Sequence, residues 1–246
     1  MVEVEDRHFW FRARNSVITA AFEGVRAGLD RGYRVLEVGC GTGNVLAALE
    51  TSATGGSITG MDLELSGLLY AKHRVARAGL VAGDAAHPPF HIKFDVIGAF
   101  DVIEHIDDDV EVLRHLGRLL TPGGTLMLTV PASPALWSYF DVAALHRRRY
   151  RRADLREKLR SAGYSIEYLT PFMTALYPFI CVGLRFMSLS RSQSRPDPAE
   201  MVEADLKVRP LSGAALQFLL RQEVRAIRSR LTLPGGTSLL AVARRP

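Results

Sequence analysis

Three glycines at alternate positions, Gly39, Gly41 and Gly43, follow an apolar and β-branched run in this chain. Because they carry no side chains, a ligand can approach the backbone closely at this turn. The next segment, about residues 42–50, has a helical pattern, and a helix that begins here directs its free amide groups toward whatever the turn holds. Such a turn at the carboxyl end of a strand is where open α/β sheets bind nucleotide-like cofactors.

Two details of this turn distinguish between cofactors. The dinucleotide fingerprint Gly-x-Gly-x-x-Gly requires glycine at its sixth position, where this chain has Asn44. Glu37 lies inside the end of the strand, just before the first glycine, and its carboxylate would repel a pyrophosphate. The same carboxylate suits a ligand with an ammonium-bearing end. The turn therefore favours a nucleotide-like cofactor with a cationic end over NAD.

Acidic residues also end the next three predicted strands. Asp62 lies about twenty positions beyond the turn, a spacing that lets its carboxylate accept both ribose hydroxyls of an adenosine. Asp84 follows the third strand, where it is placed to read an adenine edge, and Asp101 follows the fourth. Because the carboxyl ends of parallel strands meet at one edge of a sheet, we expect Glu37 and these acids at one ligand site.

The elements that must position these acids alternate between strand and helix from residue 33 to about residue 130. This alternation is typical of an α/β fold with a doubly wound, mostly parallel sheet. Strands are expected at residues 33–38, 57–61, 80–82, 94–100, 125–130, 164–169 and 237–243. Helices are expected at about residues 42–50, 64–77, 107–120 and 152–162.

Two segments lie outside this predicted core. Residues 1–30 contain an aromatic and basic cluster that opens a helix, and we expect them to form a cap. Residues 170–236 separate the last two strands, where a minimal fold needs only a short connection. A connection of this length is usually a lid or a substrate-binding element. The expected organisation is therefore a cap, a core at 31–169, a helical substrate cap at 170–236 and a closing strand at 237–246.

Composition places the chain among ordinary globular proteins, with 246 residues, 48% hydrophobic and 23% charged. Cys40 and Cys181 show no metal-ligand spacing, so neither a disulfide framework nor a metal site is expected. The acidic N-terminus lacks the apolar core of a secretory signal, and a cytoplasmic location is expected. The apolar run within residues 171–189 is too short to span a membrane and is either a packed helix or a peripheral membrane contact.

The net charge of +5 is concentrated in the arginine run, which we define as Arg147, Arg148, Arg149, Arg151 and Arg152. Such a run indicates either an anionic partner, such as a phosphate, a nucleic acid or a lipid surface, or the solvated start of a helix. Composition alone leaves both interpretations open.

The segment from Glu37 to Gly43 resembles the first motif of class I S-adenosylmethionine-dependent methyltransferases. Residues 101–105 and 119–124 resemble later motifs of that family, and residues 5–14 and 130–150 resemble bacterial small-molecule methyltransferases of glycan, lipid or natural-product pathways. The resemblance implies a seven-stranded Rossmann-like fold whose last strand lies antiparallel beside the fifth. It also implies S-adenosylmethionine contacts at Glu37, Gly39, Cys40, Gly41, Gly43, Asp62, Leu63, Gly83, Asp84, Ala85, Phe100, Asp101 and Val102, and in the cap at Trp10, Phe11 and Arg14.

Candidates for handling the methyl acceptor lie after the fourth and fifth strands. A hydroxyl or ammonium acceptor must lose a proton, and His105 and His146 are the candidate bases. Asp141 is close enough in sequence to orient His146, and Tyr150 is a candidate hydrogen-bond partner of the acceptor.

The sequence thus predicts methyl transfer from S-adenosylmethionine to a small-molecule or lipid-linked acceptor. Nucleic-acid base chemistry is disfavoured because residues 101–104 lack the Asn/Asp-Pro-Pro-aromatic motif. Three alternatives stay open: an RNA methyltransferase that uses the arginine run, an NAD-dependent oxidoreductase, and a non-catalytic cofactor-binding protein. RNA binding would depend steeply on salt, because phosphate contacts release counterions.

Overall fold

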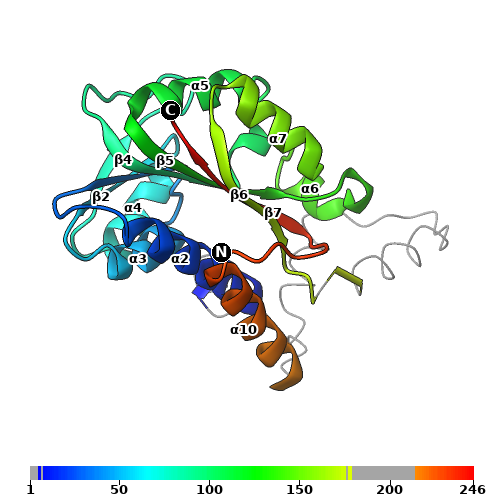
Figure 1. Ribbon diagram of the computed structural model, residues 1–246. Helices are drawn as coiled ribbons and strands as arrows, with labels where there is room; N and C mark the ends of the chain where they lie inside the picture. Colours follow the sequence, from blue (N-terminus) through cyan, green and yellow to red (C-terminus); the bar gives the residue numbers. More distant parts are fainter. Residues whose placement is uncertain (1–4, 7, 176, 179–213) are drawn as a thin grey trace.

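The computed structural model describes residues 5–6, 8–175, 177–178 and 214–246 (Figure 1). One sheet of seven strands runs through the described part in the order β3-β2-β1-β4-β5-β7-β6. The strands are β1 (Arg34–Val38), β2 (Ser57–Asp62), β3 (Gly79–Ala82), β4 (Phe94–Phe100), β5 (Leu120–Pro131), β6 (Ser165–Phe172) and β7 (Ser238–Arg244). Strands β1 to β5 pair in parallel, whereas β7 lies antiparallel between β5 and β6. The expected fold class and the position of the last strand are confirmed.

Helices cover both faces of this sheet (Figure 1). They are α2 (Phe9–Arg26), α3 (Asn44–Ser52), α4 (Leu65–Arg74), α5 (Asp109–Leu119), α6 (Tyr139–Ala143), α7 (Arg152–Ser161) and α10 (Ala214–Arg228), with short 3-10 turns at Ile103–His105 and Pro134–Leu136. Successive residues of a strand point to opposite faces, so Val96 packs with α2, α3 and α10, while Ile97 packs with α5 and α7. The central strand β4 is accordingly apolar along nearly its whole length.

Several element ends differ from the predicted ones for reasons of hydrogen bonding. Helix α4 ends at Arg74 rather than near residue 77. The carboxylate of Glu50 accepts the backbone N–H groups of Ala76, Arg77 and Ala78 at 2.5–2.9 Å, which holds this segment extended as it enters β3. Strand β6 extends beyond residue 169 because Thr170–Phe172 pair with β7. Strand β5 begins earlier than predicted because Leu120 pairs with Phe94 of β4, before a register shift that precedes Thr125.

Helix α10 lies within the segment predicted to form a substrate cap. Its residue Ile227 shares one core with Phe22 of α2 and Val242 of β7, and Arg228 pairs with Glu23 at 2.9 Å. This helix is therefore a layer of the core. Residues 179–213, which hold most of the rest of that segment and much of its apolar run, lie outside the described residues. Within the described ranges, no helix combines the length and apolar character that crossing a bilayer requires.

Candidate active site

The sheet order brings the predicted acids together at one edge. Strands β3, β2, β1 and β4 are consecutive neighbours, and Asp84, Asp62, Glu37 and Asp101 lie at or just beyond their carboxyl ends. This grouping depends on a reversal of strand order between β1 and β4, which is the topological position where open α/β sheets bind ligands.

The glycine turn between β1 and α3 has a shape that only glycine adopts without strain. Gly39 and Gly43 have φ values of +69° and +79°. A Cβ atom on Gly39 would lie 2.5 Å from Cγ2 of Val102, and one on Gly43 would lie 2.9 Å from Cβ of Ala71. The turn is also held from β2, since the Gly41 N–H donates to Oδ2 of Asp62 at 2.6 Å. Close packing from both sides therefore leaves a bare backbone at the sheet edge.

Glu37 is a buried carboxyl group without a partner for one of its oxygens. The residue is 2% exposed, and its Oε2 atom makes no hydrogen bond. Burial raises its pKa to about 8; the guanidinium of Arg14 opposes this shift and Asp62 adds to it. A buried oxygen that lacks a donor fits a ligand that brings N–H or O–H groups to the turn.

The start of α2 reaches this edge through Arg14. Arg14 donates from Nη1 to Oδ2 of Asp101 at 2.7 Å, and its guanidinium carbon lies 5.4 Å from the ring centre of Trp10 and 5.9 Å from that of Phe11. Thr129 donates to the other oxygen of Asp101 at 2.9 Å. Asp101 has a φ of +57°, a strained conformation for a residue with a side chain, and these bonds hold it there.

Arg74 ties the chain before α2 to the glycine turn. It bonds Glu5 at 2.7 Å, Asp6 at 2.9 Å and the hydroxyl of Thr42 at 2.8 Å. Sequence reasoning missed this residue because 69 positions separate Arg74 from Glu5, and no local pattern marks the pair. The contacts close residues 5–6 over the beginning of α3.

The other predicted cofactor contacts differ in their surroundings. Cys40 is buried, and its side chain packs against Gly60 of β2, so that only its backbone faces the turn. Leu63 is exposed at the rim. Asp84 lies in an exposed turn, where Oδ1 accepts from the Ala86 N–H at 2.8 Å. Gly83, Ala85 and Val102 are half-buried, and Phe100 is buried at the end of β4.

His146 and Asp141 form the pair that their spacing predicted. Asp141 is fully buried, and its Oδ1 lies 2.9 Å from Nδ1 of His146. Arg149 and the Ser138 backbone N–H donate to the same carboxylate at 2.7 and 2.8 Å. Burial acts to raise the pKa of Asp141, but the bonds from His146 and Arg149 prevail and hold it below its ordinary value. The ionised carboxylate keeps the proton of His146 on Nδ1 and leaves Nε2 as an acceptor.

His105 and Glu104 complete this polar cluster. The ring centres of His105 and His146 are 4.9 Å apart, and Oε1 of Glu104 lies 4.0 Å from Nε2 of His146. Glu104 is fully buried, and neither of its carboxylate oxygens has a hydrogen-bond partner. Burial, reinforced by Asp101, raises its pKa well above the ordinary range. Sequence reasoning did not single out Glu104, because its neighbour His146 is 42 positions away.

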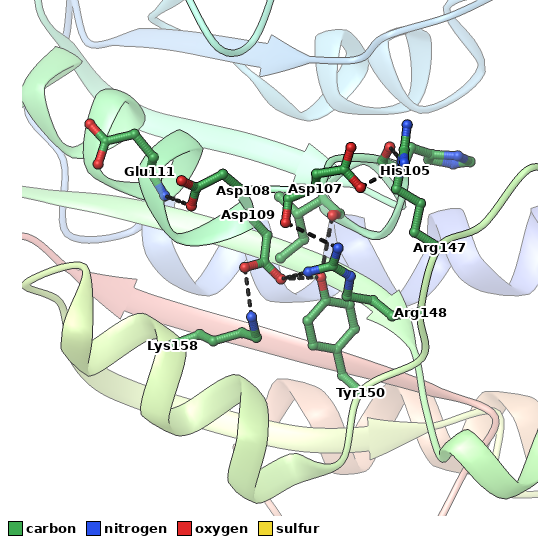
Figure 2. Close-up of polar contacts among 10 residues, drawn as sticks. His105, Asp107, Asp108, Asp109, Glu111, Arg147, Arg148, Tyr150 and Lys158 are labelled. Carbon is green, nitrogen blue, oxygen red and sulfur yellow. Dashed lines mark hydrogen bonds and ion pairs between the residues drawn. The ribbon is translucent and has the colours of Figure 1, made fainter.

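Tyr150 is placed differently from the prediction (Figure 2). It is 1% exposed, and its hydroxyl donates to Oδ2 of Asp109 at 2.8 Å. Asp109 is itself buried and also accepts from Lys158 at 2.7 Å and Arg148 at 3.2 Å. The hydroxyl of Tyr150 is thus bonded within this buried cluster and does not face the predicted acceptor.

Three members of the arginine run are paired within the chain. Arg147 bonds Asp107 at 2.6 Å and the backbone oxygen of His105 at 2.7 Å (Figure 2), Arg148 bonds Asp109, and Arg149 bonds Asp141. The pairs of Arg147 and Arg148 fix the segment after β5 against the segment after β4, whereas the Arg149 pair lies within the segment after β5. Most of the run therefore serves the internal structure rather than an anionic partner.

Comparison with known proteins bears on this site. Residues 8–169 match the model of a family described as a methyltransferase domain. A probable S-adenosylmethionine-dependent methyltransferase of Mycolicibacterium smegmatis is 28% identical over 66% of this chain and 62% of its own. A ubiquinone biosynthesis O-methyltransferase of Pseudomonas aeruginosa is 29% identical over 48% of this chain and 53% of its own. The chain thus spans less than two thirds of the length of these relatives.

Solved structures share the fold at low sequence identity. The plantazolicin methyltransferase in complex with a substrate analogue and S-adenosylhomocysteine aligns with a TM-score of 0.63 at 17% identity, over 99% of this chain and 88% of its own. A [4+2]-cyclase, SpnF, aligns with a TM-score of 0.59 at 21% identity, over 98% of this chain and 84% of its own. Because these two proteins differ in their named activities, the likeness supports the fold and leaves the reaction to the site.

Proposed function

This chain belongs to the methyltransferase-domain family, and from that premise we propose that it methylates a small-molecule or lipid-linked acceptor with S-adenosylmethionine. The observation that carries the proposal is the unpartnered, buried Glu37 beside a glycine turn that Asp62 holds. A cofactor with an amino-acid end and a ribose supplies the donors that this edge lacks.

The residues present fit that cofactor. In the proposal, the carboxylate of Asp62 accepts the ribose hydroxyls, and Glu37 accepts from the amino-acid end. The bare backbone of the glycine turn permits close approach, because added Cβ atoms would clash with Val102 and Ala71. Trp10, Phe11 and Arg14 cover the site and exclude water, a role consistent with the Arg14–Asp101 ion pair.

When bound, the cofactor supplies a methyl group on a positively charged sulfur. The acceptor's lone pair forms the new bond to carbon as the carbon–sulfur bond breaks, and a hydroxyl acceptor also gives up its proton. The chain must therefore hold the acceptor in line and govern the loss of that proton. We assign this task to His105 and His146, with Asp141 as the residue that positions His146.

The acceptor cluster is continuous with the cofactor edge. The positive charge of Arg14 partly opposes the burial that raises the pKa of Glu37 and of Glu104, so this guanidinium lies near both carboxyl groups. Asp101, which pairs with Arg14, acts on the pKa of Glu104 and of His105. The geometry supports one site with a cofactor end and an acceptor end.

The alternatives are less well supported. A pyrophosphate would meet Glu37, and Asn44 replaces the third fingerprint glycine, which disfavours NAD. An RNA methyltransferase would need the arginine run free, yet three of its members are paired internally. A protein that only binds the cofactor would not need the Asp141–His146 pair beside it.

The proposal is tested with methyl-labelled S-adenosylmethionine and a panel of phenols, catechols, amines and short-chain lipids. We expect label transfer to at least one acceptor, and a loss of about a hundredfold or more in that rate for His146→Ala at unchanged S-adenosylhomocysteine affinity. His91→Ala, which removes an exposed histidine, is the matched control and should behave as the unaltered protein. Full transfer activity in His146→Ala would remove this residue from the mechanism.

Glu37 gives cofactor binding a pH dependence. With a ligand-free pKa of about 8, its carboxyl group carries a proton near neutral pH. An ammonium group or donor beside it favours the charged form, so binding releases that proton and affinity rises with pH until the ligand-free pKa is passed. We expect S-adenosylhomocysteine affinity to increase about tenfold between about pH 6 and pH 8.

The stability of the ligand-free protein should change in the opposite sense. A raised carboxyl pKa stabilises the fold at low pH, and this contribution is lost as pH rises from about 4.5 through about 8.

Calorimetry of S-adenosylhomocysteine binding in buffers of different ionisation enthalpy measures directly the proton released on binding. Glu37→Gln should abolish it and flatten the affinity profile, whereas equal proton release in the variant would assign the titration to another group.

A further inference from the structure

Three side chains at the acceptor end bring metal-ligand atoms together. Among the described residues, Glu104, His105 and His146 each offer one ligand atom, and these atoms all lie within 4.8 Å of one another. Two ligands of a tetrahedral zinc-sized ion, each bonded at about 2.0–2.1 Å, are about 3.4 Å apart. A movement of under about 1 Å per side chain would therefore bring all three onto one ion.

Glu104 provides an independent sign that something is missing from this cluster. The residue is fully buried, and neither of its carboxylate oxygens accepts a hydrogen bond. A buried carboxyl group is ordinarily hydrogen-bonded, paired with a charge or bound to a metal. The nearest polar atom on His146, Nε2, lies 4.0 Å away and is an acceptor, because Asp141 holds the proton on Nδ1. When Glu104 is ionised, two acceptors therefore face each other, as two ligands of one cation would.

The surrounding charges would leave an ionised Glu104 without a compensating charge. The neighbouring carboxylates are already compensated, Asp101 by Arg14 at 2.7 Å and Asp141 by Arg149 at 2.7 Å. No ion pair to a lysine or arginine is recorded for Glu104 within the described ranges. A cation bound to Glu104 would complete the charge balance of the cluster.

From this geometry we propose that Glu104, His105 and His146 bind a divalent transition-metal cation. Two imidazoles and one carboxylate favour zinc, iron, cobalt or manganese over magnesium and calcium, which prefer oxygen ligands. Asp141 is then the residue that orients a ligand, since metal-bound histidines almost always donate their other N–H to a carboxylate or carbonyl. His105 lies at the exposed rim, so the ion can enter from solvent.

The inference deepens the proposed function and rests on it for its catalytic meaning. Three protein ligands leave coordination positions open, and an oxygen of the acceptor is the group that would fill one. A bound cation would lower the pKa of a coordinated hydroxyl, which would lose its proton to solvent and attack the methyl carbon as the carbon–sulfur bond breaks. The acceptor class is therefore an oxygen nucleophile, and His105 and His146 govern its proton loss as ligands of the ion rather than as bases.

Cobalt titration of the whole, chelator-treated and tag-free chain tests the site without an acceptor. We expect visible d–d absorption that saturates at one equivalent and is displaced by zinc. Glu104→Gln keeps the shape of the side chain and His105→Ala alters an exposed residue, so both variants should fold. Each should weaken cobalt binding about a hundredfold, since loss of an outer partner alone costs up to that amount.

The control variant is His91→Ala, which should bind cobalt as the unaltered protein does. Equal affinity in all variants, or no saturable cobalt spectrum, would overturn the metal site. S-adenosylhomocysteine calorimetry on the chelator-treated protein separates this proposal from the previous one. Cofactor binding without metal binding refutes the metal site alone, and metal binding without cofactor binding refutes the methyltransferase function alone.

Discussion

Replacing Asp62 with alanine is expected to weaken S-adenosylhomocysteine binding about a hundredfold. In the proposed site, two ribose hydroxyls donate to this carboxylate, and hydrogen bonds to a charged group contribute about 1.5–3 kcal/mol each. The loss of one strong bond or two weak ones corresponds to about two powers of ten in affinity. The substitution also frees the Gly41 N–H, which Asp62 holds at 2.6 Å, and so loosens the turn itself. Calorimetric titration of both proteins measures the difference.

Asp95→Ala is the matched control for this experiment. Asp95 lies at the opposite end of the same sheet, where its carboxylate accepts from the Arg34 N–H at 2.8 Å and from Thr121 at 3.2 Å. It should leave cofactor affinity unchanged. Unaltered affinity in a folded Asp62→Ala protein would refute the assigned ribose contact.

Replacing Asp109 with alanine is expected to lower the free energy of unfolding by about 3 kcal/mol. This carboxylate is 2% exposed and holds Lys158, Arg148 and the hydroxyl of Tyr150 (Figure 2). Removing one partner of a buried ion pair costs about 3–5 kcal/mol. The lower figure applies because the side chains of Lys158 and Arg148, 28% and 29% exposed, can turn toward water. Denaturant unfolding measures the change.

Asp107→Ala provides the comparison from the same loop. Asp107 also pairs with an arginine, at 2.6 Å, but its side chain is 75% exposed. A solvent-exposed pair contributes little, so this variant should change the free energy of unfolding by about 0.5 kcal/mol or less. Similar losses in the two variants would show that burial does not set the stability of this cluster.

Local patterns were enough to predict most of the sheet and its cofactor edge. The apolar run of β4 and the glycine turn after β1 are readable because burial and turn geometry restrict residue types over a few neighbouring positions. The Asp141–His146 pair was predictable for the same reason, since five positions separate the two residues. Their roles toward a cofactor and an acceptor remain proposals.

Interactions between distant segments were not predictable in this way. Arg74 meets Glu5, and Glu104 meets His146, only after the sheet has formed. The position of Tyr150 after the fifth strand predicts a contact with the acceptor, but its ring lies in the core, where Asp109 accepts its hydrogen bond. Polarity and position in a loop do not reveal which way a side chain faces.

The most direct test of the central claim is calorimetric titration of the whole chain, freed of bound ligand, with S-adenosylhomocysteine and with NAD. We expect saturable binding of S-adenosylhomocysteine at one site and no heat from NAD, because Glu37 suits an ammonium-bearing ligand and Asn44 replaces the third glycine of the dinucleotide fingerprint. Binding of NAD, or no response to S-adenosylhomocysteine, would contradict the assignment of this sheet edge to the methyl-donor cofactor.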